Sequence, residues 1–162
     1  MAQVQTARER EAGDGVIDLQ RFFPYRLAVL AEEVSRTVAQ LYSDRFDLTR
    51  HEWRVLAALA ANRQMAAKDV AGYTTLDKMS VSRAVAALET KAYLTREEDP
   101  ADRRNKILRL TPAGRALYQK IVPLARARER HILDALTSAE RAALDVIMKK
   151  LLGRARDLRE RG

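Results

Sequence analysis

The chain of 162 residues contains no cysteine and only six glycines and four prolines. The absence of cysteine excludes disulfide bonds, thiolate metal sites and thiol-based redox sensing. The low content of glycine and proline disfavours a low-complexity chain and suits a protein rich in helix. No run of 18 or more apolar residues occurs, and the polar start MAQVQTARERE has no hydrophobic signal region. The sequence therefore predicts a cytoplasmic protein without a membrane partner.

Features typical of catalytic sites are equally scarce. The two histidines, His51 and His131, are 80 positions apart, and neither has metal-ligand spacing or a neighbouring candidate nucleophile. The chain also has no glycine-rich loop of the kind that binds phosphate groups. We therefore expect a protein that is not an enzyme and that holds no cofactor and no metal.

The net charge of +8 is concentrated in the C-terminal third of the chain. Residues 1–65 contain nine Lys/Arg and nine Asp/Glu, residues 66–111 nine and seven, and residues 112–162 twelve and six. The three net charges are therefore 0, +2 and +6. Because the central segment is almost neutral, its charge supports nucleic-acid binding only weakly. The order of the predicted elements is the stronger indication.

Apolar residues recur at helical spacing in six segments, and most of these segments follow a residue that can cap a helix. Thr49 and Thr137 each stand three residues before a glutamate, which is the capping-box pattern. Asp77 and Thr111 are further predicted N-caps, the latter followed by proline. Counted from the cap where there is one, the predicted helices cover residues 24–44, 49–62, 66–73, 77–88, 111–135 and 137–158.

The segment 77–88 combines polar residues near its start with apolar residues for a core. The polar residues are Lys78, Ser80, Ser82 and Arg83, and the apolar ones are Met79, Val81, Val85 and Leu88. We predict that the apolar residues face the core and that the polar face enters a DNA groove. Short or bidentate hydrogen-bonding groups near a helix start are suited to contacting base edges and phosphates.

Residues 93–98 and 106–111 flank a segment rich in turn-forming residues, so an antiparallel hairpin is predicted. The turn contains Arg103 and Arg104. A guanidinium there suits the narrow, negative minor groove of A·T-rich DNA, and Asp102 is placed to orient Arg104. The alternative is an ordinary surface hairpin with solvated charges.

The long helices at both ends of the chain carry more apolar surface than one small winged domain can cover. We therefore predict a fold that is mostly α with a small β-hairpin wing, in which a winged helix-turn-helix (48–111) joins a helical dimerisation lobe (16–47 and 112–162) after a flexible tail (1–15). A second copy of the chain would cover the apolar surface and give a homodimer. The alternative is an intramolecular helical hairpin in a monomer.

Three blocks of the sequence resemble the MarR family of bacterial transcriptional regulators. They are LTRHEWRVLAAL (48–59), LDKMSVSRAVAALETKAYLTR (76–96) and DPADRRNKILRLTPAG (99–114), and the resemblance extends from Phe22 to Leu158. It implies a homodimer on a pseudo-palindromic double-stranded DNA operator, with each recognition helix in the major groove and each wing in the minor groove.

The resemblance also implies roles for individual residues. Ser80, Ser82 and Arg83 would contact bases and phosphates, and Asp102 and Arg104 would form the minor-groove contact. The implied contacts to the DNA backbone are Lys68, Thr75, Lys78 and Arg103. The family often has glycine where this chain has Ala92, and alanine in a left-handed helix cap costs about 1 kcal/mol. Either the helix ends differently here, or the chain tolerates the strain.

Members of this family are usually repressors, and many are released by a small, often aromatic acid. The resemblance therefore implies a small-molecule effector, such as an aromatic acid or its CoA thioester. The candidate ligand residues are Arg26, Arg36, His51, Trp53 and Arg54. Other roles are open: His51 as a solvated first-turn residue, Trp53 as a core residue, and Arg26 in a salt bridge with a partner-chain acid.

A protein that uses a winged helix only for protein contacts is the rival hypothesis. Such an adaptor would bind no specific DNA. It would have little use for polar residues on a surface shaped to fit a duplex, namely Ser80, Ser82, Arg83 and Arg104. The sequence therefore favours the DNA-binding regulator.

Overall fold

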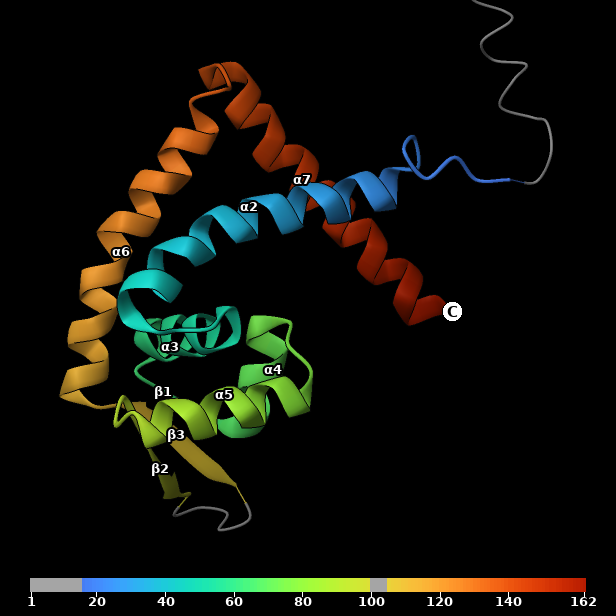
Figure 1. Cartoon of the computed structure of the whole chain (residues 1–162). Helices are drawn as coiled ribbons and strands as arrows, with labels where there is room; N and C mark the ends of the chain where they lie inside the picture. The colour runs from blue at the N-terminus through green and yellow to red at the C-terminus, as the bar shows by residue number, and fades with distance from the viewer. Residues whose placement is uncertain (1–15, 100–104) are drawn as a thin grey trace, which may run out of the picture. The chain divides into compact units, whose positions relative to one another are not determined.

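The computed structural model describes residues 16–99 and 105–162, so the predicted tail of residues 1–15 lies outside it. The described chain is mostly helical with one small sheet, which confirms the predicted fold class (Figure 1). Its elements are α2 (Phe23–Phe46), α3 (Arg50–Asn62), β1 (Gln64–Ala66), α4 (Ala67–Thr74), α5 (Lys78–Thr90), β2 (Leu94–Glu98), β3 (Lys106–Leu110), α6 (Pro112–Leu133) and α7 (Ser138–Arg161). None of these helices is both long enough and apolar enough to cross a membrane.

The predicted helix caps are confirmed. At the start of α3, the backbone N–H of Glu52 donates to the Thr49 hydroxyl at 3.2 Å, and the N–H of Thr49 donates to the Glu52 carboxylate at 2.8 Å. Thr137 and Glu140 form the same capping box at the start of α7. These local contacts satisfy backbone donors that the first turn of a helix leaves unpaired.

The predicted hairpin is confirmed, and a third strand joins it. Strands β2 and β3 pair antiparallel, with Glu98 opposite Lys106 and Leu94 opposite Leu110. Strand β1 pairs with the other edge of β3, so the strand order is β1-β3-β2. The sequence did not predict β1, because three residues are too few to show an alternating pattern. Ala66, which was predicted to begin a helix, instead ends β1 and caps α4.

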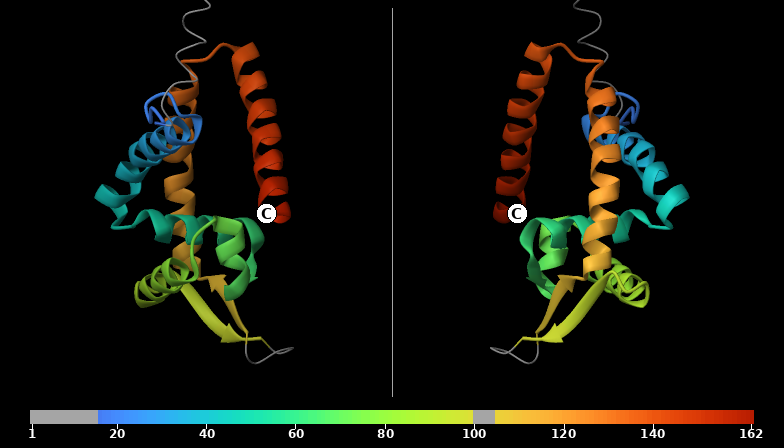
Figure 2. Two further views of the ribbon diagram at one scale, coloured as in Figure 1. Left: turned by 90° about the vertical axis from the view of Figure 1, so that its right-hand side faces the viewer. Right: turned by 90° about the vertical axis from the view of Figure 1, so that its left-hand side faces the viewer.

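The described residues divide into two compact units, the first ending at Arg36 and the second beginning at Thr37. The hydrophobic core lies in the second unit and takes side chains from α2 through α6 and from strands β2 and β3. Its buried members are Tyr42, Leu48, Val55, Leu56, Leu59, Val70, Val81, Ala84, Val85, Leu88, Leu94, Leu108, Leu110, Leu117 and Ile121. The helix-turn-helix and the hairpin are therefore built on one core, and Figure 2 shows the hairpin projecting away from the helices.

Helix α5 ends in a left-handed turn at Ala92, where φ is 57°. The N–H of Ala92 donates to the carbonyl of Glu89 at 2.9 Å, and the N–H of Tyr93 donates to the carbonyl of Leu88 at 2.8 Å. This pair of bonds is a Schellman motif, which satisfies the last carbonyls of the helix. The chain thus keeps the left-handed cap and tolerates alanine where glycine would be less strained.

The start of α6 lies directly against the end of this turn. The Thr111 hydroxyl donates to the carbonyl of Ala92 at 2.8 Å, and the N–H of Thr111 donates to the carbonyl of Tyr93 at 3.1 Å. A Cβ atom on Gly114 would lie 2.0 Å from the Tyr93 carbonyl oxygen, closer than atoms can approach. Glycine at this position is what allows α6 to begin so close to the winged module.

Helix α7 has no buried residue. Its apolar side chains include Ile147, Leu151 and Leu158, which are 51%, 44% and 64% exposed. Figures 1 and 2 show α7 separating from α6 after the turn that joins them. The apolar side chains of α7 therefore have little cover within the second unit.

Candidate nucleic-acid interface

Helix α5 has two opposite faces. One face is buried in the core through Val81, Ala84, Val85 and Leu88. The other face is exposed and consists of Met79, Ser82, Arg83 and Ala86, which follow one another at positions i, i+3, i+4 and i+7. The predicted burial of Val81, Val85 and Leu88 is confirmed, as is the exposure of Ser82 and Arg83. We call these four residues the exposed face of α5.

The prediction for Met79 was wrong. The sequence placed Met79 in the core with Val81, but its side chain is 60% exposed. Two residues along an α-helix are about 200° apart around the axis, because one turn takes about 3.6 residues. Met79 therefore points away from Val81 and joins the exposed face of α5.

The N-terminus of α5 is capped by Asp77. One Asp77 carboxylate oxygen accepts the Ser80 backbone N–H at 2.8 Å, and the other accepts the Ser80 hydroxyl at 2.6 Å. The hydrogen bond from the Ser80 hydroxyl, and to a smaller extent the one from its backbone N–H, hold the pKa of the exposed Asp77 carboxyl below its ordinary value. The Ser80 proton is engaged in the cap, so its hydroxyl keeps only lone pairs for another partner.

A groove of about 320 Å³ runs beside the N-terminal half of α5. Its lining brings together three predicted DNA-binding residues, Lys68 of α4 with Lys78 and Ser82 of α5. Arg96 of β2 also lines this groove and forms an ion pair with Glu89 at 3.1 Å. Sequence reasoning missed Arg96, because only the packing of β2 beside α5 places it here.

Thr75 lies in the turn between α4 and α5 in the left-handed conformation, with φ 57° and ψ 26°. Its hydroxyl donates to the carbonyl of Thr74 at 2.7 Å. The DNA backbone offers only hydrogen-bond acceptors, so the predicted contact of Thr75 with it is left to the Thr75 main chain. The tight turn itself fixes where α5 begins.

The wing carries pairs of opposite charge. The Lys106 ammonium lies 2.8 Å from the Glu98 carboxylate, and this contact lowers the pKa of Glu98. Arg109 lies 3.7 Å from Glu97. Two acidic side chains of the wing are thus each paired with a basic one, which reduces the negative charge that the wing presents. Asp102, Arg103 and Arg104 lie outside the described residues.

The C-terminal end of α5 is attached to the start of α3 by Lys91. The Lys91 ammonium donates to the Asp47 carbonyl and lies 3.3 Å from the carboxylates of both Asp47 and Glu52. Only 5% of the Glu52 side chain is exposed, so this contact is largely shielded from solvent. Lys91 and Glu52 are 39 positions apart, so no local sequence pattern predicts their contact.

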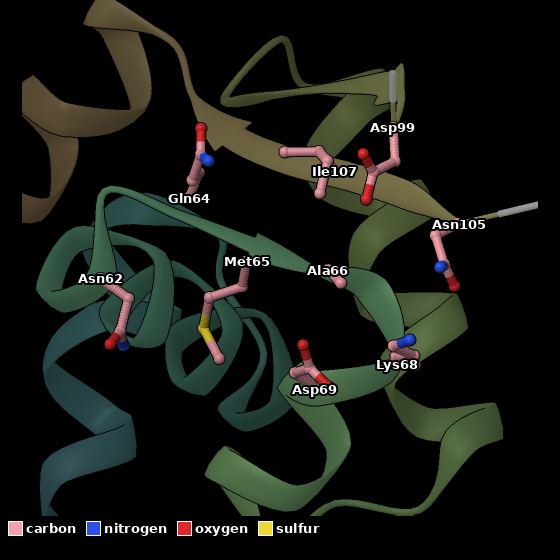
Figure 3. Close-up of a pocket in the computed structure, with 9 residues that line it drawn as sticks. All are labelled: Asn62, Gln64, Met65, Ala66, Lys68, Asp69, Asp99, Asn105 and Ile107. Atoms are coloured by element: carbon pink, nitrogen blue, oxygen red, sulfur yellow. The ribbon is translucent and has the colours of Figure 1, made fainter. Parts of the chain in front are cut away.

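A second cavity, of about 440 Å³, lies at the base of the wing (Figure 3). Its lining comes from the end of α3, from β1, from the start of α4 and from the hairpin: Asn62, Gln64, Met65, Ala66, Lys68, Asp69, Asp99, Asn105 and Ile107. None of the five predicted ligand residues is among them. Within residues 16–99 and 105–162, no cluster of three histidine, aspartate or glutamate residues could hold a metal ion.

The predicted ligand residues fall in both compact units. Arg26 and Arg36 belong to residues 1–36, where Arg36 forms exposed ion pairs with Glu32 at 3.7 Å and Glu33 at 3.4 Å. His51, Trp53 and Arg54 belong to α3 in the second unit. His51 is exposed in the first turn of that helix, in agreement with its role as a solvated residue.

Trp53 stacks with two tyrosines from other helices. Its ring centroid lies 5.5 Å from that of Tyr42 in α2 and 5.8 Å from that of Tyr118 in α6, at interplanar angles of 22° and 19°. Trp53 is half-buried and packs against the core, which supports its role as a core residue. Burial raises the pKa of Tyr42, and the charges of Arg50 and Arg54 partly oppose that shift. Sequence reasoning missed Tyr118 as a neighbour of Trp53 and missed the effect of Arg50 on Tyr42.

Comparison with known proteins agrees with this geometry. Residues 46–105, which include the helix-turn-helix and the first strand of the hairpin, match the model of the MarR family. The chain is 27% identical over 105 residues to the transcriptional repressor NicR of Pseudomonas putida, a match that covers 65% of this chain and 66% of NicR. The chain therefore spans slightly less than two thirds of that relative. Such relatives are transcriptional regulators, not enzymes.

Two solved structures have the same fold over most of the chain. BpsR of Bordetella bronchiseptica, whose DNA binding is regulated by 6-hydroxynicotinic acid, is 28% identical with a TM-score of 0.76 and covers 85% of this chain and 97% of its own. A MarR/EmrR family regulator from Acinetobacter is 27% identical with a TM-score of 0.78 and covers 87% of this chain and 99% of its own. The likeness extends beyond the winged module to the flanking helices.

Proposed function

The chain belongs to the MarR family of winged-helix transcriptional regulators, and on that premise we propose that it binds specific double-stranded DNA as a homodimeric, ligand-responsive repressor. The observation that carries the proposal is the exposed face of α5. This face is opposite the buried one, so the core can hold the helix while Ser82 and Arg83 contact another molecule. A regulator of this kind acts on DNA, and we therefore place it in the cytoplasm.

In the proposed complex, α5 enters the major groove with its N-terminal half leading. Arg83 has the planar donors for a bidentate contact with guanine, and Ser82 can donate to a base or a phosphate. The ammonium groups of Lys68 and Lys78 suit phosphates on the rim of the groove. The Ser80 hydroxyl can accept a hydrogen bond from a base amino group, and Thr75 can contact the DNA backbone through its main chain. Asp102, Arg103 and Arg104 are proposed for the minor groove from the sequence alone.

The proposal is tested by selecting duplexes from a random library with the full-length chain and measuring binding by fluorescence anisotropy. Binding through phosphates should weaken steeply with salt, with log K falling by about 0.9 per phosphate contacted. Arg83→Ala should weaken binding by about 1–3 kcal/mol. Arg126→Ala removes an exposed arginine of α6 and is the matched control, which should bind as the wild type does. If no duplex is enriched even at low salt, the adaptor hypothesis replaces this one.

The homodimer is proposed because the apolar side chains of α7 have so little cover within one chain. Symmetric pairing of identical chains is the commonest way to bury such a surface. Two related α5 helices predict a pseudo-palindromic operator, with half-sites about one helical turn apart. A footprint limited to a single asymmetric half-site would contradict this symmetry.

The proposed effector is an aromatic acid or its CoA thioester. Support comes from the Tyr42–Trp53–Tyr118 stack, beside which Arg50 and Arg54 supply positive charge, and from the regulation of BpsR by 6-hydroxynicotinic acid. Arg26, Arg36 and His51 remain proposed ligand residues on the resemblance alone.

Thermal-shift measurements with hydroxybenzoates, 6-hydroxynicotinate and benzoyl-CoA test this part of the proposal. A ligand at about 100 times its dissociation constant should stabilise the fold by about 2.7 kcal/mol. It should also release the selected duplex, and Arg54→Ala should weaken both effects while Arg126→Ala leaves them unchanged. If every compound leaves both the melting temperature and the DNA affinity unchanged, an aromatic acid is not the effector.

A further inference from the structure

Met79 is an exposed apolar side chain in the first turn of the helix that is proposed to enter the major groove. It is 60% exposed and belongs to the same face as Ser82 and Arg83. An exposed methionine has no special meaning on an ordinary surface. On a recognition helix it does, because the N-terminal residues of such a helix lie against base edges.

The chemistry of the side chain limits what Met79 can contact on a duplex. A thioether has no hydrogen-bond donor and no charge, so Met79 cannot hold a phosphate as Lys78 or Arg83 can. Among the groups that base pairs display in the major groove, the C5-methyl of thymine is the apolar one. An unbranched, polarizable side chain can adjust its shape to such a methyl group.

We propose that Met79 determines sequence specificity by contacting the C5-methyl group of one thymine in each half-site. The inference rests on the proposed DNA binding and adds an apolar contact to it. Ser82 and Arg83, one turn further along α5, would make the polar contacts with neighbouring bases. The operator should therefore contain a thymine at a fixed position in each half-site, beside the base that Arg83 contacts.

Replacing thymine by uracil in the selected duplex tests this contact, because uracil lacks only the methyl group and pairs with adenine in the same way. Each thymine is replaced in turn, together with its symmetry mate. Loss of one buried methyl group should weaken binding about fourfold per half-site. The loss should appear at one symmetric pair of positions for the wild-type chain.

Variants of Met79 assign the effect to this side chain. Met79→Ala should bind the thymine duplex more weakly and should no longer distinguish thymine from uracil at that pair of positions. Met79→Leu keeps an apolar side chain of similar size and should retain the distinction. Because Met79 is not part of the core, the melting temperatures of both variants should match that of the wild type.

The outcomes separate this inference from the proposed function. If the wild type and Met79→Ala respond equally to uracil at every position, Met79 contacts no thymine methyl, although specific DNA binding stands. A sensitive position in the wild type that Met79→Ala lacks and Met79→Leu keeps would support the contact. Failure to select any specific duplex would overturn both proposals together.

Discussion

Helices α5 and α7 are both amphipathic, yet they differ in how much of their apolar face is buried. Helix α5 buries four apolar residues in the core, whereas α7 buries none, although it is almost twice as long. An apolar face stabilises a protein only where something covers it. The winged module supplies that cover for α5 from its own chain, whereas the proposed partner chain would supply it for α7.

The segment that contains α5 and the segment that contains α7 also differ in net charge. The segment 66–111 has a net charge of +2, whereas residues 112–162 have +6. The residues proposed to contact DNA thus lie in the less basic region, where Lys68 and Lys78 line one groove and two acids of the wing, Glu97 and Glu98, are paired. Placement of a few charges, more than net charge, distinguishes the proposed DNA-binding surface.

The largest expected effect is on the core beneath α5. Leu88 is completely buried, and Leu88→Ala should lower the free energy of unfolding by about 2–5 kcal/mol, because it leaves a cavity. Chemical denaturation monitored by circular dichroism measures this change. The loss should be the same at every protein concentration. A loss below about 1 kcal/mol would mean that the core around α5 is loosely packed.

The same truncation on α7 sharpens the contrast. Leu151 is 44% exposed, so Leu151→Ala should change the unfolding free energy of the monomer by less than about 1 kcal/mol. In the proposed dimer, Leu151 is covered by the partner, and its loss should raise the dissociation constant by about tenfold or more. Analytical ultracentrifugation over a concentration series measures both states. A wild-type chain that stays monomeric throughout would contradict the homodimer.

The two capping boxes allow the same comparison between the winged module and α7, with a smaller expected effect on stability. Glu52 of α3 is buried and contacts Lys91, whereas Glu140 of α7 is exposed. Glu52→Gln should lower the free energy of unfolding by about 2 kcal/mol, because it removes the negative charge beside a shielded ammonium group. Glu140→Gln should have a smaller effect. A double-mutant cycle with Lys91→Met should assign most of the Glu52 effect to Lys91.

Lowering the pH should produce the smallest change in stability, because it acts on exposed helix caps. Hydrogen bonds from Ser80 and Thr137 lower the pKa values of Asp77 and Glu140, whose ordinary values are 3.8 and 4.5. A carboxyl with a lowered folded pKa contributes stability that is fully present above its ordinary value and is lost as the pH falls through the lowered one. The difference in melting temperature between wild type and Asp77→Asn should therefore change only below about pH 4. A constant difference down to pH 2 would exclude this linkage.

Much of the fold could be predicted from short stretches of sequence. Thr49, Asp77, Thr111 and Thr137 were predicted as caps because a cap needs only a side chain and the three residues after it. Strand β1 was missed because its three residues pair with β3, more than forty positions away. The sequence left open whether α5 ends in a left-handed cap at Ala92. The two Schellman hydrogen bonds around Ala92 show that it does.

The candidate DNA surface was predicted only in part. Lys68, Lys78 and Ser82 were predicted separately and lie on one groove, but Arg96 joined them only when β2 packed beside α5. Met79 was assigned to the core because it is apolar, although its position along the helix places it opposite Val81. Residue type was a weaker guide there than helical geometry.

By itself, the sequence determined the kind and order of the elements, because helix caps, helical periodicity and turn residues act over a few neighbouring positions. Tertiary structure alone decided which apolar residues are covered and which charges meet. The Lys91–Glu52 contact and the Tyr42–Trp53–Tyr118 stack join residues from different helices, and no local pattern specifies them. Burial and ion pairing depend on what lies nearby in space, and the packing of the whole winged module sets those neighbours.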